Sequence, residues 1–181
     1  MEIRFSGFGG QGIIRMGMIT GKAASIYDGR NATLTQSFGP EARGGACSAQ
    51  LVVADERILY PYIAKPDILV TMSQEAYFKF EHELKKDGWL LLEEDLVTPH
   101  PPRASIRQYA VPATRIAEQM GNRMYANMVM LGFFGAITGI VSLEALQKAL
   151  PGMVPERSVP KNKTALAKGW DIGKKQLAEQ S

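Results

Sequence analysis

The first 17 residues, MEIRFSGFGGQGIIRMG (residues 1–17), place a glycine-rich turn between an expected strand and an expected helix. Residues 1–6 alternate apolar and polar side chains, which predicts a short strand, and from Gln11 onward apolar residues recur at helical spacing. The turn satisfies the G-x-G-x-x-G pattern in the strand-to-helix context that this pattern requires. Because the amides of a helix N-terminus can bind a phosphate, one interpretation is a dinucleotide site.

The remainder of a dinucleotide fingerprint is missing from the sequence. That fingerprint expects an acidic residue about 20 positions further on, at the end of the second strand, where it binds the ribose hydroxyls. The expected second strand, residues 31–36, ends in Gln36 and Ser37, and Asp28 precedes it. The glycines are therefore equally consistent with a tight turn and close packing of helix on sheet, without any contact to an anion.

Further strands and helices alternate along the first two thirds of the chain. Ser73 is expected to cap a helix that follows a short buried strand. The expected additional strands cover residues 46–53, 67–71, 89–92 and 106–111. The expected later helices cover residues 113–120, a strongly apolar stretch from 125, a segment between Ser142 and Pro151, and residues 162–178.

This order of elements predicts an α/β fold: a three-layer, Rossmann-like domain with a mixed, largely parallel sheet and a C-terminal helical extension. We expect residues 1–181 to form a single domain. Its α/β body covers residues 1–151, and residues 152–181 form a linker arm and the terminal helix.

Composition limits the classes of partner. The 181 residues are 45% hydrophobic and 22% charged, as in an ordinary soluble domain. The formal net charge is +3, and residues 156–181 hold six basic and three acidic side chains. An excess this small and local does not indicate nucleic acid binding, which calls for a broad basic face.

Few side chains in the sequence could hold a metal or act as a nucleophile. Cys47 is the single cysteine, so the chain cannot build a disulfide, a Cys-x-x-Cys zinc site or a four-thiolate iron–sulfur cluster. His82 and His100 have no companion at metal-ligand spacing. We therefore expect no metal site and no catalytic residue in this chain.

The expected location is the cytoplasm, without membrane insertion. The N-terminus enters a strand at once, which leaves no room for a signal peptide. Residues 124–141 are apolar over about the length of a membrane span, but they include Asn127 and several small residues. The better interpretation is a helix buried in the core or beneath a partner.

A second unusual loop, SFGPEARGG (residues 37–45), places Glu41 and Arg43 beside Gly44 and Gly45, directly before a strand. An arginine in such a loop can present two parallel donors to a carboxylate or a phosphate. The alternative is an Arg–Glu ion pair that only holds the loop in place.

Four blocks together resemble, in order and spacing, the gamma subunit of 2-oxoacid:ferredoxin oxidoreductases. The blocks are GFGGQGIIRMG (7–17), QSFGPEARGGA (36–46), KPDILVTMSQEAY (65–77) and RMYANMVMLG (123–132). The second and third blocks look most like the branch that uses 2-oxoglutarate, because the pyruvate branch more often has a methionine at the position of Ala42. Phe38 departs from the tyrosine common in the family.

This resemblance implies a hetero-oligomeric enzyme in which other subunits hold the cofactors. The partners would be thiamine diphosphate-binding alpha and beta subunits with their Mg, a ferredoxin-like subunit with iron–sulfur clusters, and ferredoxin. The complex would convert a 2-oxoacid and coenzyme A into acyl-CoA, CO2 and reduced ferredoxin, and the isolated chain would be inactive. The resemblance implies that two loops face the partner's active site or coenzyme A; their residues are Gly9, Gly10, Gln11, Gly12, Glu41, Arg43, Gly44 and Gly45.

Two other functions stay open at this stage. The chain could be the corresponding subunit of a pyruvate, 2-ketoisovalerate or indolepyruvate ferredoxin oxidoreductase, whose glycine and Arg-Gly-Gly loops are similar. It could also be a free-standing dinucleotide-binding protein, which the glycine turn favours and the missing ribose-binding acid disfavours.

Overall fold

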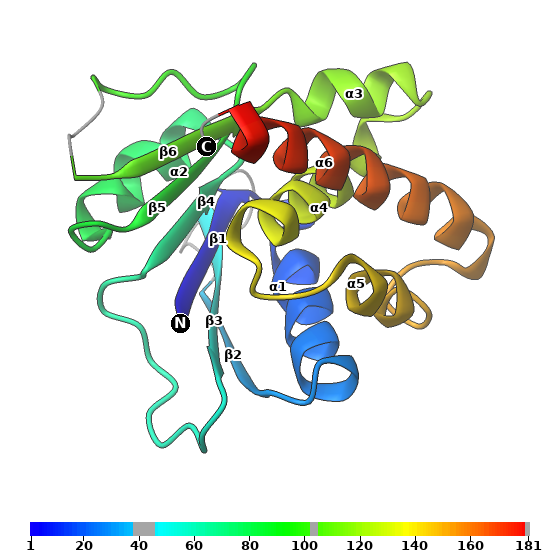
Figure 1. The fold of residues 1–181 in the computed structure, drawn as a ribbon. Coiled ribbons are helices and arrows are strands. Elements are labelled where there is room, and N and C mark those ends of the chain that lie inside the picture. The colour runs from blue at the N-terminus through cyan, green and yellow to red at the C-terminus, as the bar shows by residue number, and fades with distance from the viewer. Residues whose placement is uncertain (38–45, 102–104, 180–181) are drawn as a thin grey trace.

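The computed structural model describes residues 1–37, 46–101 and 105–179, and Figure 1 shows their fold. Four of the residues expected to form a site, Glu41, Arg43, Gly44 and Gly45, lie outside the described residues.

A six-stranded sheet forms the centre of the described fold, with the strand order β2-β3-β1-β4-β5-β6. Strand β3 runs antiparallel to both of its neighbours, β1 and β2, whereas β1, β4, β5 and β6 pair in parallel. This arrangement confirms the prediction of a mixed, largely parallel sheet. The strands are β1 (Glu2–Phe8), β2 (Asn31–Ser37), β3 (Ala46–Ala54), β4 (Ile68–Thr71), β5 (Trp89–Glu93) and β6 (Arg107–Val111).

The helices follow the predicted order, and the last one begins three residues earlier than expected. Pro160 stands in its first turn, where a proline is tolerated because the missing N–H has no intrahelical partner there. The α-helices are α1 (Ile13–Lys22), α2 (Gln74–Phe80), α3 (Ala113–Gln119), α4 (Ala126–Thr138), α5 (Leu143–Ala149) and α6 (Val159–Glu179). Short segments of other helical types are η1 (Ala23–Tyr27), η2 (Glu81–Glu83), η3 (Arg123–Tyr125) and η4 (Glu156–Ser158).

The two faces of the sheet are covered unequally. Figure 1 shows α1, α4, α5 and α6 on one face and α2 on the other. The larger core lies beneath α1 and α4, where the rings of Phe5 and Phe134 meet edge to face with their centroids 5.1 Å apart. The smaller core lies beneath α2 and includes Leu69, Phe80 and Leu90. The predicted three layers are therefore present, with most of the apolar mass on one side.

Helix α4 is buried on all sides, as its apolar sequence predicts. Helix α6 lies against it, and small residues allow the two backbones to meet. A Cβ at Gly132 would overlap the backbone of Leu166, and one at Gly169 would overlap the backbone of Val129. Among the described residues, no helix combines the length and the apolar character that crossing a membrane requires.

Candidate functional site

The parallel strands end at one edge of the sheet, and three helices begin there. Strands β1, β4 and β6 lead directly toward α1, α2 and α3. In open α/β sheets this edge, outside the carboxyl ends of the strands, is where ligands bind. The glycine-rich turn of residues 9–12 stands on this edge, between β1 and α1.

Gln11 holds the turn in place through both ends of its side-chain amide. The backbone N–H of Phe8 donates to Gln11 Oε1 at 2.7 Å, and Gln11 Nε2 donates to the carbonyl of Met72 at 2.9 Å. Because Met72 directly follows β4, the amide connects the ends of two neighbouring strands. Gln11 therefore contributes to the site by positioning the turn.

The glycines of the turn adopt conformations that other residues rarely adopt. Gly10 and Gly12 have φ angles of 95° and 77°, in the left-handed region. Gly12 is the N-cap of α1 and provides no side-chain acceptor, so no side chain of the cap occupies the first-turn amides. Space next to Gly9 and Gly10 is open. The turn thus leaves the positive end of α1 accessible to an anion.

A pocket of about 280 Å³ lies in front of this turn. Two guanidinium groups, from Arg15 and Arg123, line it, and no acidic side chain does so among the described residues. Together with the helix N-terminus, these cations favour a negatively charged ligand. The lining residues are Gly9, Gly10, Gln11, Gly12, Arg15, Met72, Thr114, Arg123, Met124, Ala126 and Asn127.

A second pocket of about 250 Å³ shares part of this lining, namely Arg15, Met124 and Asn127. It adds a third cation, Arg157, and again no acidic side chain lines it among the described residues. We call the two pockets together the basic cleft. Its charge comes from α1, η3 and η4, three elements far apart in the sequence.

Asn127 supplies a buried polar group at the junction of the two pockets. It is 5% exposed and lines both pockets. The amide lies directly against Gly12, since a Cβ there would overlap it. An amide carries two donors and one acceptor, so Asn127 can hydrogen-bond a ligand in either pocket.

A buried carboxylate fixes the far wall of the cleft. Glu93, at the end of β5, is fully buried, and its Oε1 accepts from the backbone N–H of Thr114 at 2.8 Å. Its other oxygen accepts from the N–H of Leu96 at 2.7 Å. Both oxygens are used internally, so Glu93 anchors the start of α3 and thereby positions Thr114.

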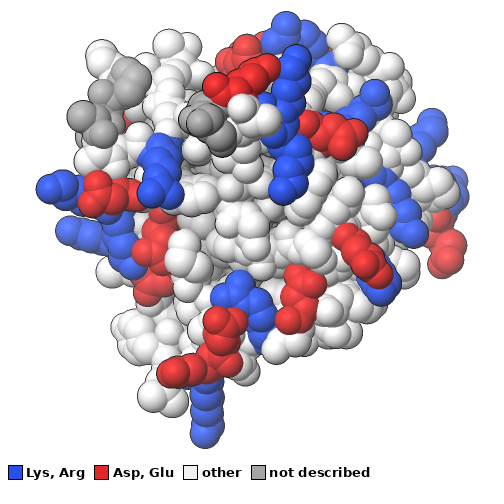
Figure 2. All heavy atoms as spheres, viewed as in Figure 1, with Lys and Arg blue, Asp and Glu red and all other residues white. Residues whose placement is uncertain are grey.

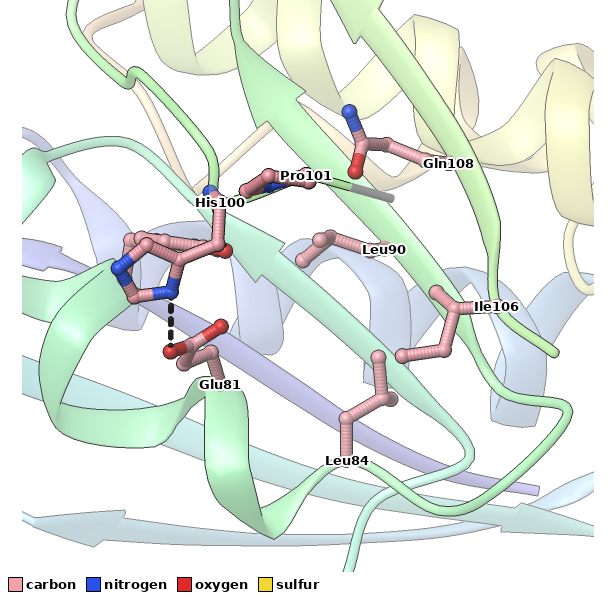
Figure 3. Close-up of a pocket in the computed structure, with 8 residues that line it drawn as sticks. Glu81, Leu84, Leu90, His100, Pro101, Ile106 and Gln108 are labelled. Carbon is pink, nitrogen blue, oxygen red and sulfur yellow. Dashed lines mark hydrogen bonds and ion pairs between the residues drawn. The ribbon is translucent and has the colours of Figure 1, made fainter. Parts of the chain in front are cut away.

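Another pocket, of about 190 Å³, lies on the opposite face of the sheet (Figure 3). His100 Nδ1 lies 2.8 Å from Glu81 Oε1, and the backbone N–H of His100 donates to the Tyr77 hydroxyl at 3.0 Å. Its floor is apolar and includes Leu90 and Ile106. It contains none of the predicted site residues, and no group of three or more potential metal ligands occurs in the described part of the chain.

Cys47 is not placed for chemistry. It is 7% exposed on β3, where it pairs with Gly7, and burial raises the pKa of its thiol. A thiol with a raised pKa is mostly protonated near neutral pH and is a weak nucleophile.

The structure joins the predicted turn to residues that sequence reasoning did not assign to the site. The charged or polar residues missed include Arg15, Arg123, Asn127 and Arg157. One sequence feature could have indicated a site here: Asn127 is a polar residue in an otherwise apolar helix. That it lies against Gly12, however, follows from the packing of α4 and not from the sequence around it. The two strands that flank the Arg43 loop also meet this side of the sheet. Strand β2 ends at Ser37, and β3 begins at Ala46, which pairs with Phe8 at the end of β1.

The described residues form a Rossmann-like α/β domain with the basic cleft at the carboxyl ends of its parallel strands. Residues 2–172 match the family described as pyruvate ferredoxin/flavodoxin oxidoreductase, and the chain belongs to this family. The resemblance inferred from the four sequence blocks is thereby confirmed.

Known relatives cover almost the whole chain. The 2-oxoglutarate synthase subunit KorC of Methanocaldococcus jannaschii is 48% identical over 175 residues, which are 96% of this chain and 94% of that protein. The gamma subunit of a keto/oxoacid ferredoxin oxidoreductase from Geobacter sulfurreducens has a similar structure, with a TM-score of 0.84 and 42% identity over 95% of this chain and 97% of that one.

A third comparison extends the fold to a longer protein. The 2-oxoglutarate:ferredoxin oxidoreductase of Magnetococcus marinus matches with a TM-score of 0.86 and 23% identity, over 96% of this chain and 31% of that chain. At this identity the match shows the shared fold alone. In that protein, the fold is one part of a longer polypeptide.

Proposed function

We propose that this chain is the gamma subunit of a multi-subunit 2-oxoglutarate:ferredoxin oxidoreductase. The observation that carries the proposal is the 48% identity, over nearly the full length of both chains, to a 2-oxoglutarate synthase subunit. The alternative substrates are pyruvate, 2-ketoisovalerate and indolepyruvate, which related enzymes of this kind oxidise.

In this proposal the chain acts with thiamine diphosphate-binding alpha and beta subunits, a ferredoxin-like subunit and ferredoxin. The complex decarboxylates the 2-oxoacid oxidatively with coenzyme A, and it releases acyl-CoA, CO2 and reduced ferredoxin. Thiamine diphosphate, Mg and iron–sulfur clusters belong to the partner subunits. The single, buried Cys47 supports that division, because a cluster needs several thiolates. We expect the assembly in the cytoplasm, where ferredoxin would accept the electrons.

The basic cleft has the chemistry to hold the anionic part of coenzyme A beside the partner's active site. Phosphate oxygens accept hydrogen bonds from helix N-terminal amides and from guanidinium groups such as those of Arg15 and Arg123. The Asn127 amide offers a further donor and acceptor. In this role the turn of Gly9, Gly10 and Gly12 permits close approach of a phosphate to the backbone.

The substrate proposal is tested by co-expressing the chain with its partner subunits and measuring ferredoxin reduction by the purified complex. We expect 2-oxoglutarate to give the highest kcat/KM among the four 2-oxoacids, and we expect no reduction by the isolated chain. A higher kcat/KM for pyruvate, 2-ketoisovalerate or indolepyruvate would make that 2-oxoacid the proposed substrate instead of 2-oxoglutarate. Failure of the chain to join any thiamine-binding subunits would refute the whole proposal.

The role of the cleft is tested in the same complex by titrating coenzyme A. Removing one charge-assisted contact with Arg123→Gln should raise the KM for coenzyme A about tenfold, since one such contact is worth roughly 1.4 kcal/mol. Lys168→Gln is the matched control, because it removes one exposed cation outside the cleft. Equal KM values for coenzyme A in both variants would show that coenzyme A does not bind in the basic cleft.

We include the loop of Glu41, Arg43, Gly44 and Gly45 in the proposed site on the basis of the family resemblance. If Arg43 meets a partner subunit or coenzyme A, Arg43→Ala should cost about 2–5 kcal/mol of association or binding and leave the isolated chain's stability unchanged. If Arg43 only holds its own loop, the cost should be about 1 kcal/mol or less, and the complex should assemble and turn over normally.

A further inference from the structure

The described lining of the basic cleft includes three methionines, and they differ sharply in exposure. Met124 lines both pockets, whereas Met72 lines the first and Met128 lines the second. Met124 is 71% exposed, and Met72 and Met128 are each 1% exposed. Met124 therefore adds little to the core, and it is the methionine of the cleft that a small molecule in solvent can reach.

The backbone of Met124 is held in place while its side chain is exposed. The N–H of Met124 donates to Asn122 Oδ1 at 2.9 Å, so that Asn122 caps the short helix η3. The residues on either side of Met124, Arg123 and Tyr125, also line the cleft. A short, capped helix thus presents the thioether to the cleft beside a guanidinium group.

An exposed thioether is open to oxidation by peroxide. The O–O bond of the peroxide breaks and one oxygen atom forms an S–O bond; the sulfur loses two electrons, and the other oxygen leaves as water. The product, methionine sulfoxide, is polar, and its oxygen accepts hydrogen bonds. Methionine sulfoxide reductases reverse the step, so the change is not permanent.

The charges around Met124 would convert this oxidation into a change in binding. The cleft is lined by the guanidinium groups of Arg15, Arg123 and Arg157, and no acidic side chain lines it among the described residues. Figure 2 shows a different pattern on the face that it draws, where acidic and basic side chains are interspersed. A sulfoxide oxygen in the cleft therefore meets guanidinium donors without a competing carboxylate, and it engages donors that an anionic ligand needs.

We propose that Met124 is a site of reversible oxidation by peroxide and that its sulfoxide weakens the binding of the anionic ligand in the basic cleft. The inference rests on the proposed function, in which this ligand is coenzyme A. Oxidation then slows the oxidoreductase by raising its KM for coenzyme A. Reduction of the sulfoxide restores an apolar side chain, which leaves the guanidinium groups to the phosphates.

The first measurement locates the oxidation in the isolated chain, away from the iron–sulfur clusters of the proposed partners. After brief treatment with hydrogen peroxide, mass spectrometry of proteolytic peptides measures the oxidation rate of each methionine. Met124 should be oxidised at least about tenfold faster than Met72 and Met128, because only Met124 of the three is exposed. Equal rates for the three methionines would overturn the inference.

The second measurement combines the oxidised chain with untreated partner subunits. Oxidation should raise the KM for coenzyme A about threefold or more and leave kcat within about twofold, and treatment with methionine sulfoxide reductases should reverse the rise. Met124→Leu keeps the side-chain volume but cannot be oxidised, so peroxide should not change the KM of this variant. Met18→Leu is the matched control: Met18 is 41% exposed and lines a different pocket, so this variant should keep the full response to peroxide.

Two results of the second measurement would overturn the inference: an unchanged KM after complete oxidation of Met124, or a rise in KM that persists in Met124→Leu. Failure of the proposed function is recognised without peroxide. In that case the untreated chain joins no thiamine-binding subunits, or Arg123→Gln and Lys168→Gln have equal KM values for coenzyme A. The selective oxidation of Met124 is then still decided by mass spectrometry of the isolated chain.

Discussion

At the scale of single residues, Gly12 is subject to two separate constraints. Its φ of 77° is strained for any residue with a Cβ, and a Cβ there would overlap the buried amide of Asn127. Gly9 has neither constraint, because it has no positive φ and no heavy atom lies within 4 Å of its Cβ position. The two glycines belong to one turn but differ both in backbone conformation and in what surrounds them.

We therefore expect Gly12→Ala to lower the free energy of unfolding by about 2 kcal/mol or more, from backbone strain and from displacement of Asn127. Gly9→Ala should change it by less than about 0.5 kcal/mol. Urea unfolding of the isolated chain measures both values. Similar values for the two variants would contradict the close contact between Gly12 and Asn127.

A charged cluster at the start of β1 predicts how stability depends on pH. Asp67 accepts from Lys85 Nζ at 2.8 Å and from the N–H of Glu2 at 2.7 Å, and Lys85 Nζ also donates to Glu2 Oε2 at 2.7 Å. Burial acts to raise the pKa of Asp67, but these hydrogen bonds outweigh it and hold the pKa below its usual value. The folded state therefore favours the ionised carboxylate.

Asp67→Asn should accordingly cost about 1 kcal/mol near pH 7, a modest value because the cluster is partly exposed. A lowered pKa stabilises the fold above the unfolded value of about 3.9, and the gain is lost as pH falls through the folded pKa. The difference in unfolding free energy between wild type and variant should thus shrink below about pH 4. A difference that stays constant from pH 7 to pH 3 would show that the carboxylate charge is unimportant.

The sequence could indicate only part of the site at this scale. The turn of Gly9 and Gly12 is a local pattern, so its place between a strand and a helix followed from adjacent residues. Arg123 and Asn127 reach the same cleft only because α4 begins opposite α1, more than 100 residues later. No local pattern encodes that approach. Arg43 lies outside the described residues, so its role stays a prediction.

At the scale of elements, the packing of α4 against α6 depends on glycine. A Cβ at Gly169 would overlap the backbone of Val129, and flexible side chains cannot relieve that contact. Gly21 in α1 offers a comparison, because its Cβ would meet only the side-chain end of Leu51, at 3.3 Å. Replacement at Gly21 needs a small adjustment, whereas replacement at Gly169 needs the helices to separate.

We expect Gly169→Ala to lower the free energy of unfolding by about 3 kcal/mol, the upper range for overpacking of a core. Gly21→Ala should be nearly neutral or stabilising by up to about 1 kcal/mol, because alanine is the better helix former. Both are read from thermal and urea unfolding. Equal effects of the two substitutions would mean that the helices are less closely packed than the structure shows.

Element types were predictable from periodicity and capping, as Ser73 illustrates. Its side chain accepts from the N–H of Ala76 at 3.3 Å and caps α2 as expected. The start of α6 was placed three residues too late because Pro160, which a helix tolerates in its first turn, was counted with the linker arm. Strand β2 was correctly located as a strand, but its position in the sheet depends on β3, and the periodicity of β2 itself carries no information about its neighbour.

At the scale of the whole molecule, the strand order argues against a dinucleotide site. In a Rossmann fold the second strand lies beside the first, and the acid at its end reaches the ribose. Here β3 lies between β1 and β2, and it runs antiparallel to both. The end of β2, at Gln36 and Ser37, is therefore one strand further from the glycine-rich turn and bears no acid.

We accordingly expect the isolated chain to bind NAD or NADP no more tightly than millimolar, which corresponds to about −4 kcal/mol. The basic cleft can attract the pyrophosphate, but without a ribose-binding acid little specific affinity is added. Calorimetric titration of the isolated chain measures this, and the Arg123→Gln variant is the control for attraction by charge alone. Micromolar affinity for either nucleotide that persists in Arg123→Gln would restore the free-standing dinucleotide-binding protein, because attraction by the charge of the cleft would then not account for it.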